Sequence, residues 1–64
     1  MERVEMILKY KDFVKRQKEV GRSSHDIFSM ACAYLEACCE AGIIEYSDLS
    51  SLREFAGNVA DEIL

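Results

Sequence analysis

The sequence predicts an all-α fold, a small three-helix bundle that forms one domain over residues 1–64. Two observations predict it. Apolar residues recur at intervals of three and four along most of the chain, which is the period of a helix. Gly21 and Gly42 divide a chain without proline into three segments of helical length. We expect helices over about 3–20, 24–41 and 48–64.

The first helix is predicted to be amphipathic. Its apolar stripe comprises Met6, Tyr10, Phe13, Gln17 and Val20, with Ile7 and Val14 beside it. Val4 and Leu8 lie off this stripe, one turn apart, and form a second small apolar patch. We expect Gly21 to end the helix, because glycine adopts the left-handed conformation that follows a helix without steric cost.

The second helix is apolar around most of its circumference. Only three polar residues interrupt the segment 27–41, and on a helix they share one sector of roughly 40°. Ser23 or Ser24 is expected to cap its amino terminus. Gly42 is expected to end it, with Ile43 folding back onto the last turn in a Schellman motif.

This apolar circumference predicts self-association. The first and third helices each offer one stripe, and chains of this size bury only about 60% of their unfolded surface. We therefore expect homodimerisation through the middle helix to complete the core. The expected interface comprises Phe28, Ala31, Cys32, Leu35 and Cys39, with Val4 and Leu8 as a further candidate patch. The opposite flank, Ile27, Met30, Tyr34, Ala37, Cys38 and Ala41, is an equal candidate, and a monomer with a central middle helix is the alternative.

The third helix has two candidate starts. Ser47 with Asp48 opens it at the earlier point, and Ser51 with Glu54 has the spacing of a capping box at the later one. Its apolar seam comprises Leu49, Leu52, Ala56, Val59 and Ile63, with Phe55 beside it.

Three residues around the third helix carry further expectations. Ile44 and Tyr46 lie in the preceding connection and are expected to plug one end of the core. Gly57 lies inside the helix, where glycine costs about 1 kcal/mol relative to alanine. Close approach of another backbone would explain its presence.

Charge is divided unevenly along the chain. Residues 1–22 hold seven basic and four acidic residues, a net charge of +3, whereas residues 23–64 hold one basic and eight acidic residues, a net charge of −7. Only Lys11, Lys15 and Lys18 form an unbroken basic line on the first helix. Three lysines are few for phosphate binding, and a pI near 4.8 adds repulsion from nucleic acid.

Other charges on the first helix are spaced to neutralise one another. Glu5 precedes Lys9 by four residues and Asp12 precedes Arg16 by four, the favourable order for helical ion pairs. The acidic remainder of the chain allows one alternative, imitation of phosphates for a nucleic-acid-binding protein. Its residues are Glu36, Glu40, Glu45, Asp48, Glu54, Asp61 and Glu62.

No combination of residues predicts catalysis. The single histidine, His25, is expected at an exposed first turn, and the three cysteines lack the spacing of a zinc site. We expect no enzyme activity, no cofactor and no metal. An odd number of cysteines and an amino terminus without a secretory leader favour reduced thiols in the cytoplasm. No membrane-spanning run is present, so we expect no membrane association.

The predicted function is therefore that of a small non-enzymatic protein–protein interaction module, a regulator, adaptor or inhibitor that acts as a helical homo-oligomer. One alternative is a weak nucleic-acid-binding regulator that uses the basic first helix. The other alternative is the acidic mimic, which would inhibit a nucleic-acid-binding protein.

Overall fold

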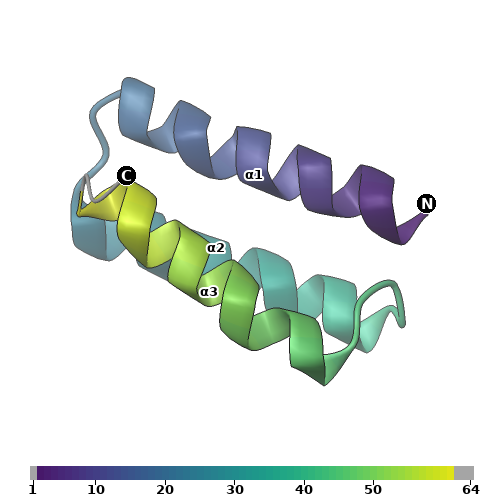
Figure 1. Ribbon diagram of the computed structural model, residues 1–64. Coiled ribbons are helices and arrows are strands. Elements are labelled where there is room, and N and C mark those ends of the chain that lie inside the picture. The colour runs from purple at the N-terminus through teal and green to yellow at the C-terminus, as the bar shows by residue number, and fades with distance from the viewer. Residues whose placement is uncertain (1, 62–64) are drawn as a thin grey trace.

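The computed structural model describes residues 2–61, which form three helices, α1 (Arg3–Glu19), α2 (Ser24–Glu40) and α3 (Tyr46–Ala60). α2 and α3 run antiparallel as a helical hairpin, and α1 lies across this pair (Figure 1). The described residues contain no strand, so the prediction of an all-α fold with three helices is confirmed.

Both predicted glycine helix ends are confirmed. Gly21 and Gly42 have positive φ angles of 85° and 75°. After α2, the N–H of Ile43 donates to the carbonyl of Cys38 at 3.0 Å, and the N–H of Gly42 donates to that of Cys39 at 3.0 Å. These two bonds define the predicted Schellman motif, which turns the chain sharply toward α3.

Capping differs between the second and third helices. Ser23 caps α2 as predicted, its hydroxyl accepting from the N–H of Asp26 at 3.2 Å. The predicted start of the third helix at Ser47 or Ser51 is wrong, because Glu45 is the N-cap and the helix begins two residues earlier than residue 48. The Asp48 carboxylate at N3 accepts from the backbone N–H of the N-cap residue Glu45 at 3.0 Å, as the N3 side chain of a capping box does.

The hydrophobic core draws one line of side chains from each helix. Its members are Met6, Tyr10 and Val14 of α1, Ile27, Ala31 and Leu35 of α2, and Leu49, Leu52, Ala56, Val59 and Ala60 of α3, with Ile44 closing one end. The predicted seam of the third helix is confirmed at four positions. The fifth, Ile63, and the predicted helix end at 62–64 lie outside the described residues.

Three expectations about individual residues are wrong. Val20 was expected in the stripe but is 64% exposed, because the helix ends at Glu19 and Val20 is its C-cap. Tyr46 was expected to plug the core but is 83% exposed, since it forms the first turn of α3, whereas Ile44 is buried as predicted. A Cβ added at Gly57 would meet no atom within 4 Å, so no backbone of the described chain approaches it closely.

An ion pair joins the first turns of α1 and α3, which are far apart in sequence. The Arg3 guanidinium forms two hydrogen bonds to the Asp48 carboxylate, one of them from Nε at 3.0 Å. Asp48 is only 8% exposed. The hydrogen bonds from Arg3 and from the N–H of Glu45 lower the pKa of Asp48 from 3.8 to about 2. Asp48 therefore both caps α3 and ties α1 to it.

We expect Asp48→Asn to lower the midpoint of thermal unfolding at pH 7 by about 5 °C. A carboxyl whose pKa is depressed in the folded state contributes stability above its ordinary pKa and loses it as the pH falls through the folded value. The difference in unfolding midpoint between the wild type and the variant should therefore shrink between pH 4 and pH 2, because the two pKa values of Asp48 are 3.8 and about 2. Thermal melts followed by circular dichroism across this range measure it.

Asp12→Asn provides the matched control. Asp12 pairs with Arg16 on the surface of α1, where both side chains are well exposed and solvent weakens the interaction. Equal effects of the two substitutions at pH 7 would contradict the special role of Asp48.

Candidate interaction surfaces

Some residues of the interface expected on the middle helix are buried in the core, and others lie at the surface. Ala31 and Leu35 are each 0% exposed and belong to the core of the single chain, so neither is available to a second protein. Cys32 and Cys39 are half-buried, and Phe28 is 38% exposed. A contact on this flank would therefore use Phe28 and the edges of the two cysteines.

The opposite flank of α2 is largely occupied by α1. Ile27 is buried, and Met30, Tyr34 and Cys38 are half-buried, whereas Ala37 and Ala41 are exposed. The Tyr34 ring lies 5.5 Å from that of Tyr10 and 5.3 Å from that of Phe13. The Cys38 thiol contacts the sulfur of Met6 at 3.2 Å, and burial raises its pKa. These contacts make the flank part of the α1–α2 packing.

The outward face of α2 is made of small or charged side chains. The exposed residues on it are Ser29, Ala33, Glu36, Ala37 and Glu40. The whole chain exposes 4273 Å², close to the surface of about 4,200 Å² that a folded monomer of this mass presents. Apart from Phe28, the bulky side chains of α2 are thus buried or half-buried within one chain, and the other apolar residues on its outward face are alanines.

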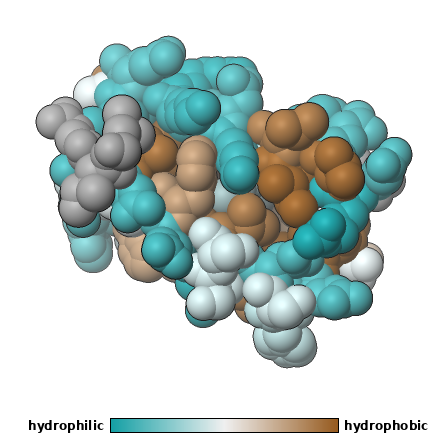
Figure 2. Space-filling model, in the orientation of Figure 1, coloured by the Kyte–Doolittle hydropathy of each residue, from teal (hydrophilic) through white to brown (hydrophobic). Residues whose placement is uncertain are grey.

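A different surface, on α1, carries large exposed aliphatic side chains. Val4 is 55% exposed and Leu8 is 64% exposed. Lys11 and Lys15 continue the same helical row, at spacings of three and four residues. Figure 2 shows hydrophobic side chains gathered over the amino-terminal half of α1. We call this row of Val4, Leu8, Lys11 and Lys15 the α1 stripe; it is apolar at one end and basic at the other.

The predicted basic line is partly used inside the chain. The ammonium of Lys11 lies 5.2 Å from the centroid of the Phe55 ring, and that of Lys18 donates to the carbonyl of Ala60 at 2.9 Å. Of the three lysines, Lys15 is exposed, and Lys11 and Lys18 are half-buried. The structure thus ties two of the three lysines to α3.

The predicted ion pairs along α1 are confirmed. Lys9 lies 3.5 Å from Glu5, and Arg16 lies 2.6 Å from Asp12, each pair one turn apart. All four side chains are more than half exposed. They form a self-neutralised solvent face beside the α1 stripe.

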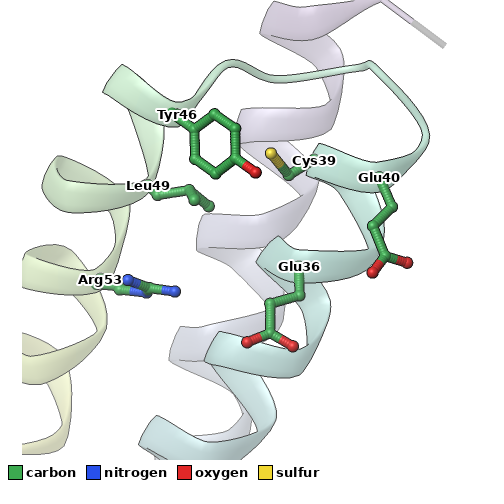
Figure 3. A pocket seen from close by; sticks show the side chains of 6 residues that line it. All are labelled: Glu36, Cys39, Glu40, Tyr46, Leu49 and Arg53. Carbon is green, nitrogen blue, oxygen red and sulfur yellow. The ribbon is translucent and has the colours of Figure 1, made fainter.

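A shallow pocket lies between α2 and α3. It has a volume of about 240 Å³ and is lined by Glu36, Cys39, Glu40, Tyr46, Leu49 and Arg53. Tyr46 and Leu49 from α3 face Cys39 from α2, while the two glutamates lie on the α2 side (Figure 3). Its floor is apolar and its rim carries charge. We call it the α2–α3 pocket.

Arg53 is the one basic residue of this pocket. Its side chain extends from α3 toward α2 (Figure 3), and its buried Nε has no hydrogen-bond partner among the described residues. No carboxylate in that part of the chain lies within ion-pair distance of it. Glu36 and Glu40, one turn apart and both exposed, leave the pocket with a net charge of −1.

The single histidine and the three cysteines all lie on α2. His25 is exposed at the first turn of α2, and the three cysteines are free and half-buried. Within residues 2–61, no group of three or more histidine, cysteine or acidic side chains is placed to hold a metal ion. No described helix is both long enough and apolar enough to cross a membrane.

No known protein family, curated protein or solved structure matches the chain. The structure also identifies residues that the sequence did not single out, namely Arg53 and the pair of Arg3 with Asp48. Arg53 was recognisable as the single basic residue after residue 22, but its place in a pocket depends on how α3 packs on α2. The pairing of Arg3 with Asp48 has no signal in the sequence pattern.

Proposed function

We propose that the chain is a small non-enzymatic protein-binding module that self-associates as an already folded unit. The observation that carries the proposal is the α1 stripe, where two large aliphatic side chains one turn apart are more than half exposed. Burying such side chains against another protein is favourable by about 1.5 kcal/mol or more each. Lysines at the end of the stripe would give such a contact direction and specificity.

This form of association differs from a shared core. Because the bulky side chains of α2 other than Phe28 are buried or half-buried within one chain, the subunits would meet as folded bodies, and binding would be reversible and dependent on concentration. We propose a reducing compartment such as the cytoplasm for this activity. The support is that three free thiols, two of them adjacent in one helix, are poorly placed to pair with each other.

The contacts of the charged residues weigh against the two alternatives. A nucleic-acid surface on α1 would need Lys11 and Lys18, which already contact Phe55 and Ala60. An acidic mimic would use Asp48, which is bound to Arg3.

Sedimentation velocity over a concentration range up to about 500 µM tests the proposal. We expect the average mass of the wild-type chain to rise with concentration. Leu8→Gln should raise the apparent Kd about tenfold, because the polar side chain removes one buried aliphatic group.

Val20→Gln is the matched control, since Val20 is exposed to the same extent, 64%, but lies beyond the end of α1 and away from the stripe. It should leave the Kd unchanged. A wild-type chain that stays monomeric throughout the range contradicts the proposal.

A further inference from the structure

We propose that the α1 stripe of one copy docks into the α2–α3 pocket of a second copy. This inference rests on the proposed self-association and names both surfaces that meet. The two surfaces share no residue, so one molecule offers both.

The pocket offers apolar contact for the aliphatic end of the stripe. Leu49 and Cys39 form its floor, and the Tyr46 ring beside them is 83% exposed. A volume of about 240 Å³ accommodates a branched aliphatic side chain such as Leu8. An aromatic side chain this exposed at the mouth of an apolar pocket is typical of a contact surface, because tyrosine offers large area at little entropic cost.

The charges of the two surfaces are complementary. Glu36 and Glu40 are four residues apart on α2 and without an ion pair in the described chain, so they repel each other. Lys11 and Lys15 have the same spacing on α1, and each pair spans about 6 Å of helix axis. Lys15 facing these two glutamates would relieve their repulsion, and Lys11, whose ammonium lies over the Phe55 ring, would add its charge from one turn away.

The same charges disfavour each surface pairing with itself. Two α1 stripes in contact would bring four lysines together, and two pockets would bring four glutamates together against only two arginines. Such like-charge contacts cost binding energy and exclude the wrong arrangement. The division of the chain into a basic first segment and an acidic remainder is therefore explained by contact between unlike surfaces of two copies.

A charge exchange tests this pairing. Lys15 and Glu40 suit it because both are exposed and neither forms an ion pair or side-chain hydrogen bond with a described residue. We expect Lys15→Glu and Glu40→Lys each to raise the Kd of self-association about tenfold. The chain that carries both substitutions, and the equimolar mixture of the two single variants, should recover the wild-type Kd to within about threefold.

Arg22→Glu and Glu54→Lys are the controls, since each makes the same change in net charge at an exposed position outside both surfaces. They should leave the Kd unchanged, and circular dichroism should show that every variant keeps its helices. If the wild type associates but the single variants behave like these controls, or the exchange restores nothing, the pairing is wrong while self-association stands. A wild-type chain that never associates overturns both.

Discussion

Ala31→Glu is expected to abolish folding, whereas Ala37→Glu, six residues further along the same helix, is expected to leave the chain folded. Ala31 is 0% exposed and Ala37 is exposed. A carboxylate at position 31 has no partner in the core, and burying an unpaired charge costs more than about 4 kcal/mol. A domain of this length has a total stability of only about 3 to 10 kcal/mol.

Far-UV circular dichroism and urea unfolding of both variants measure this difference. The substitution and the helix are the same, so helix propensity and added charge cancel in the comparison. Equal stability of the two variants would mean that position 31 is accessible, and the packing of α2 described above would then be wrong. The comparison also determines which substitutions can report on an interface, since only a residue outside the core dissociates an oligomer without unfolding its subunits.

The pattern of apolar residues was sufficient to predict the helices and most of the core. Periodicity located the line of Met6 and Tyr10 on α1 and the seam of α3, because burial on a helix repeats with its turn. Glycine predicted both helix ends, because only the left-handed conformation closes a Schellman motif at Gly21 and Gly42. Helix periodicity and helix ends depend on residues a few positions apart, so the sequence shows them directly.

The circumference argument for the middle helix counted alanine and cysteine with leucine. Ala33 and Ala37 face solvent, and a methyl group in water costs little compared with a leucine side chain. The fully buried line of α2 is Ile27, Ala31 and Leu35, and Met30, Tyr34 and Cys38 beside it are half-buried. The number of apolar residues on a helix therefore overstates how much of it needs covering.

The remaining features depend on tertiary packing. The contact of Arg3 with Asp48 joins residues 45 positions apart, and the pocket around Arg53 exists only because α3 lies against α2. Neither residue type nor spacing encodes such a juxtaposition. The sequence identified Val4 and Leu8 as an apolar patch. It did not show that Lys18, the last member of the basic line, is bound to the carbonyl of Ala60, which leaves Lys11 and Lys15 as the lysines that continue the patch.

Tyr10 is the residue at which all three helices meet. It is 0% exposed, its ring lies 5.5 Å from that of Tyr34 and 6.3 Å from that of Phe55, and its hydroxyl donates to the carbonyl of Leu52 at 2.7 Å. Burial raises the pKa of the phenol, with the nearby thiol of Cys32 acting in the same direction. At neutral pH the side chain is therefore a neutral hydrogen-bond donor.

We expect Tyr10→Ala to cost about 3 to 5 kcal/mol, enough to unfold much of the population, because it removes an aromatic ring from the centre of the core. Tyr10→Phe should cost only about 1 kcal/mol, since it keeps the ring and the Leu52 carbonyl stays within the hydrogen-bond pattern of α3. Tyr46→Ala is the control, because the same substitution at a side chain 83% exposed should change the stability by no more than about 0.5 kcal/mol. Urea unfolding at a concentration where the chain is monomeric separates the three. A Phe variant as unstable as the Ala variant would assign the stability to the hydroxyl rather than to the ring, and the core would then depend on one polar bond between α1 and α3.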